Sequence, residues 1–422
     1  MNRRRFLKTG GIITAASAIS PSLAGNAFSN NAADGVIPKE LISSIRSKIK
    51  PITAEERQQR IEKARSLMAE NKIDALFMEG GTSLKYFSKA RWGHSERLFA
   101  MILPLKGDIF YIAPKFEEAR AREQTGNAMI YCWEENESPY ELVKKVLAEK
   151  NMLHAAIGIE ETTRFFVTEG LQKAIPTLTL KSGTPATAGC RSVKSNEEIQ
   201  LMQIANNITA EVYKAAVKQL KEGMTEREFG SLITDLFAEF DVDGGALVLF
   251  GEASAYPHGL VKEVRLKEND VVLIDGGCTV EGYESDITRM AVFGKPTDKM
   301  KKNLELVRKA QDAGLKAAKP GAEAWTVDAA ARKVITDNGY GPAYKYFTHR
   351  LGHGIGMDGH EWYYLAGGNK YILKPGNMFS NEPGIYIPGE FGIRLEDEML
   401  IDSVGATLLL PRQDSFDNMF GS

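Results

Sequence analysis

Residues Thr348–Gly359 read THRLGHGIGMDG, and the interpretation of the whole chain starts from this stretch. Two histidines, His349 and His353, stand four residues apart in a run that has glycine at alternate positions from Gly352 to Gly356. Because each glycine weakens a helix, the run does not predict a regular helix. Alternate glycines indicate backbone packed closely against a neighbouring segment, with His353 projecting from it.

Four acidic side chains stand at matched positions around this histidine. Asp275 and Asp286 flank a segment with a turn sequence, and so do Glu382 and Glu396. If the chain folds back at each turn, the members of a pair fall close to opposite positions on one face of a hairpin, about 5 Å apart. Asp275 and Glu382 each end an apolar run, so the acids are expected to converge in the core. Surface ion pairing is the alternative, but it does not explain why acids end apolar strands.

Carboxylates gathered in a core repel one another and lose hydration, so they require a positive charge between them. Four carboxylates and one imidazole suit one metal ion or two. Oxygen-rich ligation with a histidine favours Mn, Fe, Co or Zn, whereas an all-oxygen set would favour Mg or Ca. Two divalent ions about 3.5–4 Å apart, bridged by carboxylates, would generate a hydroxide nucleophile and polarise a carbonyl.

The motifs around these residues resemble the dinuclear metallopeptidases of the pita-bread fold. This group includes Xaa-Pro aminopeptidase, prolidase and methionine aminopeptidase, with creatinase as a metal-free relative. The motifs are LIDGG at Asp275, SDITR at Asp286, GHGIG at His353, NEPGIY at Glu382 and GIRLED at Glu396. The resemblance covers roughly residues 190–412, and RSVKSNEEI from Arg191 is similar to the start of this domain in the Xaa-Pro branch.

The resemblance implies two divalent ions, with Mn as the first choice and Co, Zn or Fe as alternatives. It also implies five metal ligands: Asp275 on one ion, His353 and Glu382 on the other, and Asp286 and Glu396 bridging both.

Other roles also follow from the resemblance. His258, in YPHG, and His360, in GHE, match two non-ligand histidines of the family that contact the substrate and the developing oxyanion. Glu382 would also shuttle the proton, and Arg394 would orient the acids of the metal site. We interpret His349 as a structural residue.

One motif departs from the family pattern, which usually has proline after His-Glu-x. Here His360 and Glu361 are followed by Trp362 and Tyr363. This position borders the substrate cleft, so a preference for proline in the substrate does not follow from the resemblance.

The C-terminal half contains a weak internal duplication. Residues 218–223 (KQLKEG) match 316–321 (KAAKPG), and 266–275 (LKENDVVLID) parallel 373–382 (LKPGNMFSNE). Pro257-His258-Gly259 stands where Gly352-His353-Gly354 stands in the second copy. Each half therefore offers two helices, one histidine and a strand ending in a carboxylate.

The N-terminal half alternates strand and helix, which indicates an α/β domain with a mixed sheet. Thr53 and Glu56 predict a capped helix start, followed by an amphipathic helix. Strands are expected at residues 75–78, 99–103, 108–113 and 155–159, and helices near 116–124 and 140–150.

The fold class is therefore α/β (α+β), in five segments. These are a twin-arginine signal peptide at 1–27, a linker at 28–40, a creatinase-like N-terminal α/β domain at 41–187, a pita-bread metallopeptidase domain with internal duplication at 188–412, and a C-terminal tail at 413–422.

The signal peptide is predicted from Arg3-Arg4-Arg5, an apolar run at 9–23 and small residues before Ala24 and Ala27. It predicts a periplasmic protein exported by the twin-arginine route, without a stable membrane anchor after cleavage. Without residues 1–27, 49 basic side chains face 55 acidic ones, a charge that disfavours nucleic-acid binding. The three cysteines are too few for a disulfide framework.

The leading hypothesis is a metal-dependent aminopeptidase or dipeptidase that takes peptides as substrate, with a preference for Xaa-Pro, and that forms a homodimer. A non-peptidase hydrolase or lyase acting on a small zwitterion is one alternative. Creatinase lacks the metal ligands, so the presence of all five ligand residues in this chain argues against a creatinase-like enzyme. A catalytically inactive binding module is the other alternative, and the loss of even one ligand would have favoured it.

Overall fold

The computed structural model describes residues 35–421 of the chain. Among the described residues, 35–52 and 192–421 form one compact unit, and Thr53–Arg191 form the other. The predicted signal peptide lies outside the described residues. Among the helices of residues 35–421, none combines the length and the apolar character needed to cross a membrane.

The unit Thr53–Arg191 is built on a six-stranded sheet in the order β4-β3-β2-β1-β5-β6. Its strands are β1 (Ala75–Glu79), β2 (Ala100–Pro104), β3 (Phe110–Pro114), β4 (Met129–Trp133), β5 (Ala156–Ile159) and β6 (Thr179–Ser182). β2 is antiparallel to β1 and β3, whereas the pairs β1–β5, β3–β4 and β5–β6 are parallel, so the predicted mixed sheet is confirmed. β4 and β6, at the two edges, were not predicted.

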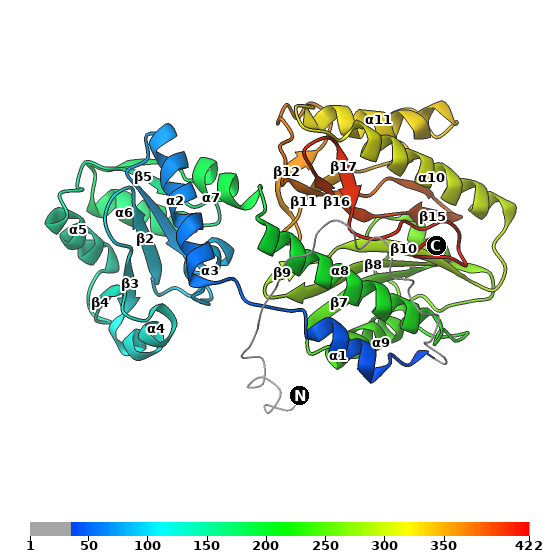
Figure 1. Ribbon diagram of the computed structural model, residues 1–422, viewed down its shortest axis with the longest axis horizontal. Helices are drawn as coiled ribbons and strands as arrows, with labels where there is room; N and C mark the ends of the chain where they lie inside the picture. Colours follow the sequence, from blue (N-terminus) through cyan, green and yellow to red (C-terminus); the bar gives the residue numbers. More distant parts are fainter. Residues whose placement is uncertain (1–34, 422) are drawn as a thin grey trace. The chain divides into compact units, whose positions relative to one another are not determined.

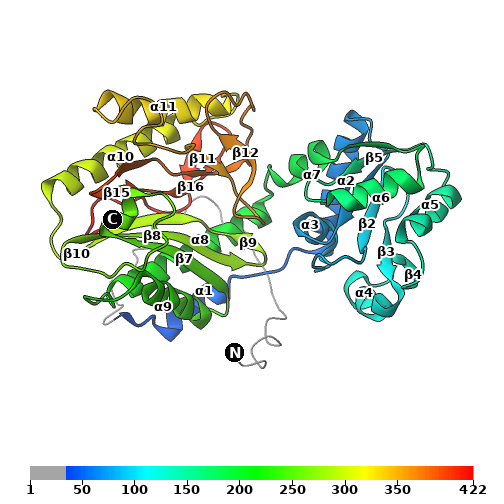
Figure 2. The same ribbon diagram turned by 180° about the vertical axis from the view of Figure 1, so that it is seen from behind.

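Helices cover both faces of this sheet: α2 lies in front of it in Figure 1, and α6 lies in front when the view is reversed in Figure 2. The helices are α2 (Ala54–Glu70), α3 (Thr82–Ser88), η2 (Lys115–Glu117), α4 (Glu118–Thr125), α5 (Pro139–Glu149), α6 (Phe165–Ala174) and α7 (Thr184–Arg191). α2 begins as predicted, because Thr53 Oγ1 accepts a hydrogen bond from the Glu56 N–H at 3.1 Å.

The other unit contains a four-stranded sheet, a five-stranded sheet and a two-stranded ribbon. The first is β10-β8-β7, with β9 paired to β8: β7 (Asp243–Phe250), β8 (Asp270–Val280), β9 (Tyr283–Glu284) and β10 (Ile287–Phe293). The second is β12-β11-β13-β16-β17: β11 (Gly352–Gly354), β12 (Glu361–Leu365), β13 (Met378–Asn381), β16 (Asp397–Ile401) and β17 (Ala406–Leu408). The ribbon is β14 (Gly384–Ile387) with β15 (Phe391–Arg394).

Two helix pairs cover these sheets. α8 (Asn196–Val217) and α9 (Glu226–Glu239) pack on β8 and β7, while α10 (Asp298–Ala317) and α11 (Ala324–Asp337) pack on β15 and β12 (Figure 1). The short helix η3 (Gly251–Ala255) follows β7. The apolar faces of the strands and of α10 and α11 form the main core of this unit.

Hydrogen bonds confirm the predicted duplication. The Gly223 N–H donates to the Leu266 carbonyl at 2.8 Å, and in the second copy the Gly321 N–H donates to the Leu373 carbonyl at 3.0 Å. The return bonds also match, because the N–H groups of Leu266 and Leu373 donate to the residues that follow the two glycines. Each copy therefore closes a helix pair onto the segment that leads to a site carboxylate, although Asp275 lies within β8 rather than at its end, whereas Glu382 directly follows β13.

Two predicted boundaries differ from the structure. α1 (Lys39–Arg46) starts inside the predicted linker and belongs with the C-terminal unit, since Arg46 Nη2 contacts Asp241 Oδ2 at 2.7 Å. The N-terminal unit consequently starts at Thr53 rather than at residue 41, and it ends at Arg191.

The predicted tail at 413–422 is also wrong for its described part. Gln413 is buried and its Oε1 accepts a hydrogen bond from the Met290 N–H at 2.8 Å, while Phe416 and Phe420 are buried. Apolar burial therefore fixes these residues to the unit.

Candidate active site

The ladder of β8 and β10 positions the two aspartates. Asp275 pairs with Thr288 in the antiparallel register, and Gly276 pairs with Ile287. Asp286 stands two positions before Thr288, and alternate residues of a strand point to one face. Asp275 and Asp286 therefore share a face as predicted, although Thr288 rather than Asp286 lies directly opposite Asp275.

The two glutamates meet between two paired segments. Asn381 pairs with Asp397 and Gly384 pairs with Arg394, so the register on both sides puts Glu382 opposite Glu396. This confirms the predicted arrangement.

His353 lies in β11, between β12 and β13 of the five-stranded sheet. A Cβ at Gly352 would lie 2.0 Å from the Ser380 carbonyl oxygen, and one at Gly354 would lie 2.4 Å from the Trp362 carbonyl oxygen. Only glycine fits between the neighbouring strands at both positions, which confirms the close packing predicted from the alternate glycines.

The tautomer of His353 follows from its contacts. Its Nδ1 lies 3.0 Å from the Gly354 carbonyl oxygen, and because a carbonyl only accepts, Nδ1 carries the hydrogen. Nε2 then holds the lone pair and faces acids, at 3.4 Å from Glu382 Oε1 and 3.9 Å from Asp286 Oδ2. A buried imidazole whose Nδ1 is bonded to a carbonyl suits a metal ligand.

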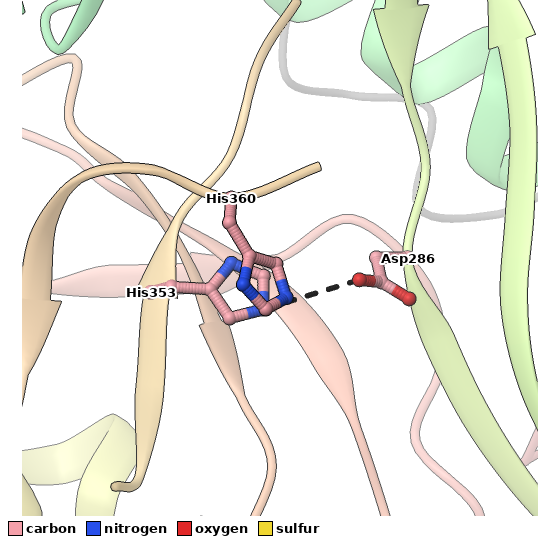
Figure 3. Close-up of side chains that lie close together, drawn as sticks. All are labelled: Asp286, His353 and His360. Atoms are coloured by element: carbon pink, nitrogen blue, oxygen red, sulfur yellow. Dashed lines mark ion pairs between the residues drawn. The ribbon is translucent and has the colours of Figure 1, made fainter. Parts of the chain in front are cut away.

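Three overlapping groups of side chains have ligand atoms within 4.8 Å of one another. The groups are Asp275, Asp286 and Glu396; His353, Glu382 and Glu396; and Asp286, His353 and His360. All five predicted ligands are therefore brought together, with His360 beside them. Figure 3 shows the third group, in which the ring of His360 lies over that of His353, with centroids 3.8 Å apart.

Three of the four site carboxyls have raised pKa values. Burial, together with the neighbouring carboxylates, raises the pKa of Asp286 and of Glu396 well above the usual range. Burial also raises the pKa of Glu382 to about 8. Raised values in a cluster of converging oxygens fit a site that holds positive ions, so the residues present fit divalent metals.

Asp275 behaves differently. Burial acts to raise its pKa, but the Arg394 guanidinium and hydrogen bonds to its carboxylate outweigh burial and hold the pKa below its usual value. Arg394 Nη2 donates to Asp275 Oδ2 at 2.6 Å, and Thr288 Oγ1 lies against Asp275 Oδ1. The Thr288 hydroxyl also lies 2.7 Å from Glu396 Oε2.

Arg394 is itself held by Tyr386 and His349. Its Nη1 donates to Tyr386 Oη at 2.9 Å, and that oxygen lies 2.7 Å from His349 Nε2. His349 Nδ1 donates to the Arg350 carbonyl at 2.8 Å, so Nε2 accepts from the tyrosine. Burial lowers the pKa of His349 to about 3. These contacts agree with the structural interpretation of His349.

The two remaining histidines lie at the edge of the pocket. His258 is exposed in the turn after η3, and the carbonyl of the preceding Pro257 accepts from Arg394 Nη1 at 3.2 Å. His258 belongs to none of the three groups found among the described residues, whereas the predicted non-ligand His360 belongs to one. Arg350 Nη2 donates to His360 Nδ1 at 3.2 Å.

Sequence reasoning missed Thr288, Tyr386 and Arg350. Thr288 stands two residues after Asp286, so period-two alternation alone could have assigned it to the same face. Tyr386 and Arg350 reach the site through side-chain contacts that no spacing predicts.

Comparisons with known proteins agree with this site. Residues 200–403 match Metallopeptidase family M24, and residues 60–193 match the Creatinase/Prolidase N-terminal domain. An uncharacterized peptidase of Schizosaccharomyces pombe is 39% identical over 340 residues, which cover 76% of this chain and 73% of that protein. The Xaa-Pro dipeptidase of Pyrococcus furiosus is 32% identical over 355 residues, which cover 83% of this chain and 97% of that protein.

A solved structure also matches. The prolidase from Thermococcus sibiricus superimposes with a TM-score of 0.77 at 32% identity, over 83% of this chain and 96% of that one. Fold and site together define a peptidase with a pocket for divalent metal ions. The chain belongs to metallopeptidase family M24, with a creatinase-type N-terminal domain followed by a pita-bread catalytic domain.

Proposed function

We propose that the protein is an exopeptidase that hydrolyses the N-terminal peptide bond of Xaa-Pro substrates, as an aminopeptidase or a dipeptidase, with two divalent ions. The convergence of four carboxylates and the Nε2 lone pair of His353 carries the proposal. Relatives described as an Xaa-Pro dipeptidase and a prolidase support the substrate class.

The ions would be held by Asp275, Asp286, His353, Glu382 and Glu396, with Mn as the first choice and Co, Zn or Fe as alternatives. Bound divalent ions would supply hydroxide as the nucleophile and polarise the scissile carbonyl. Asp286, Glu396 and His353 each belong to two of the three groups. Because His353 offers only the Nε2 lone pair, the two carboxylates are the residues suited to bridge two ions.

The protein's own groups handle protons and orientation. Glu382 takes a proton from the attacking water and returns it to the leaving amine. His258 and His360 contact the substrate carbonyl and its developing negative charge from the edge of the pocket. Arg394 holds Asp275 in the orientation needed for ligation.

We also propose that residues 1–27 direct export by the twin-arginine route to the periplasm and that the mature protein is a homodimer. The arginine run and the apolar segment that follows it support export.

A panel of peptides tests the activity. The metal-loaded protein should cleave Xaa-Pro dipeptides and tripeptides, and a parallel Xaa-Ala set measures the dependence on proline. The Xaa-Ala set matters because Tyr363 stands where the family pattern has proline. Glu382→Gln should abolish turnover in the same panel. A protein that contains metal yet cleaves no member contradicts the proposal.

A further inference from the structure

Arg350 is a cation beside the pocket that none of the roles above includes. Its Nη2 lies 3.2 Å from His360 Nδ1, and its guanidinium carbon lies 4.2 Å from the centroid of the Tyr364 ring. Tyr364 pairs with His353 across β11 and β12. The aromatic ring that the Arg350 guanidinium contacts therefore belongs to the residue opposite His353. Within residues 35–421, no carboxylate forms an ion pair with Arg350.

The contact with His360 determines where that imidazole carries its hydrogen. A guanidinium has five N–H donors and no acceptor. Arg350 therefore donates to His360 Nδ1, which must hold a lone pair. A neutral imidazole with its lone pair on Nδ1 carries the hydrogen on Nε2. Since Arg350 occupies Nδ1, the Nε2–H of His360 is the group left to face Asp286 and His353.

His353 has the opposite arrangement, although the two rings are 3.8 Å apart. Its Nδ1 donates to a carbonyl, so its Nε2 offers a lone pair to the pocket. Two neighbouring imidazoles thus present different groups, one a metal ligand and the other a hydrogen-bond donor. The difference arises from what faces Nδ1, a carbonyl oxygen at His353 and a guanidinium at His360.

We propose that Arg350 is a positioning residue that fixes His360 as the Nε2–H tautomer, so that His360 donates to the substrate oxygen and does not ligate metal. Tyr364 keeps the guanidinium in place through cation–π contact. The proposal rests on the exopeptidase function above for the identity of that oxygen, but the tautomer of His360 can be measured without catalysis.

Three substitutions of Arg350 separate the effect of its hydrogen-bond donation from the effects of its charge and size. Arg350→Met leaves His360 Nδ1 without a donor, so both tautomers become populated and kcat should fall about tenfold or more while KM changes little. Arg350→Lys restores a side chain that only donates, and it should recover most of the kcat. Arg350→Glu places an acceptor at Nδ1 and should lower kcat as much as the loss of an oxyanion donor, about 10²–10³-fold.

Lys345→Met is the matched control, because Lys345 is also a cation over a tyrosine, at 4.9 Å from the ring centroid of Tyr346, but is exposed. Its kcat should equal that of the unaltered protein. Melting temperature and metal content measured for every variant identify one that fails to fold or to bind metal. For such a variant the lysine substitution and the spectra below carry the test.

Nitrogen NMR of the Zn²⁺-loaded protein, labelled in histidine, reads the tautomer directly. The chain has six histidines, and the His360 signals are assigned as those lost in His360→Gln. We expect hydrogen on Nε2 in the unaltered protein and a mixture in Arg350→Met. Hydrogen on Nδ1 in the unaltered protein, or an unchanged tautomer and kcat in Arg350→Met, overturns the proposal. So does a rise in KM alone, confined to substrates with a free carboxylate, because Arg350 would then contact the substrate itself.

Discussion

Arg394 and Asp275 are 119 positions apart, yet Arg394 Nη2 donates to Asp275 Oδ2 at 2.6 Å. This bond makes the pocket asymmetric. Asp275 is held in its ionised form by a neighbouring guanidinium, whereas the pKa values of Asp286, Glu382 and Glu396 are raised by burial and mutual repulsion. One part of the site is thus already neutralised by the protein, and the rest requires positive ions.

Arg394→Met should weaken metal binding by about 10–100-fold, because a ligand that loses its orienting partner binds metal less well. Calorimetric titration of the metal-free variant with Mn²⁺ measures this. Lys299→Met, which removes an exposed ion pair with Glu390, is the control and should bind as the unaltered protein does. Unchanged affinity in Arg394→Met would exclude the orienting role.

Removal of metal should make stability depend on pH between about 6.5 and 8. The folded metal-free protein keeps protons on carboxyls such as Glu382, whose pKa is about 8, while the unfolded chain releases them above about 4.5. Because the folded state binds more protons there, the free energy of unfolding falls as pH rises through this window. Each unit of pKa difference corresponds to about 1.4 kcal/mol.

Two histidines act in the opposite direction below this window. His349 and His353 have pKa values lowered to about 3 by burial, so below pH 6.5 the unfolded chain gains protons on these two side chains, which offsets part of the stability contributed by the protonated carboxyls. The lowered pKa of Asp275 changes the free energy of unfolding only below about pH 3.8. Urea unfolding at several pH values, with and without metal, tests the pattern. Bound metal should make the free energy of unfolding depend less steeply on pH between 6.5 and 8. A metal-free protein whose free energy of unfolding does not change over this range contradicts the raised pKa values of the carboxyls.

A buried ion pair should hold the loop that carries His360. Lys194 Nζ lies 2.9 Å from Glu361 Oε2, and both side chains are almost fully buried. Glu361 Oε1 accepts from the N–H groups of Met357 and Asp358, inside the loop. Lys194→Met removes the cation from this buried carboxylate and should cost about 3–5 kcal/mol of unfolding free energy.

The double variant Lys194→Met/Glu361→Gln removes both charges and should recover part of that loss. Lys309→Met, which removes an exposed pair with Glu305 on α10, should change stability by less than about 0.5 kcal/mol. If Lys194→Met is as stable as this control in urea unfolding, the ion pair does not hold the loop.

Much of the site was predictable from sequence because the predicted ligands lie in strands or directly beside strand ends, where the alternation and register of the strands still hold. Asp275 and Asp286 follow period-two alternation around one turn, and Glu382 and Glu396 obey the register of a hairpin. The glycines beside His353 predicted close packing, since no other residue fits between the strands. These inferences need only local geometry.

Other features depend on contacts between distant segments. Arg350 contacts His360 across a β-bulge, at which the β11–β12 register shifts between His353 and Gly354. No spacing in the sequence predicts this register shift. Edge strand β6 is short and half-exposed, so it lacks an apolar pattern. Residues 413–421 resembled a tail because their few apolar side chains are scattered, yet Phe416 and Phe420 are buried.

The proposed export signal lies outside the described part of the chain. Changing Arg3 and Arg4 together to Lys should leave the protein in the cytoplasm with residues 1–27 uncleaved, because the twin-arginine pair is read by the export receptor. Cell fractionation followed by N-terminal sequencing measures both. Normal periplasmic yield of the double variant would mean that the segment has another role.

The central claim is that five side chains hold two ions while two histidines do not. Anomalous scattering from crystals grown with Mn²⁺ tests it most directly. We expect two peaks, one beside Asp275 and the other beside His353 and Glu382, with Asp286 and Glu396 contacting both. His258 and His360 should lie outside coordination distance. A single peak, or either of these two histidines coordinating an ion, would contradict the claim.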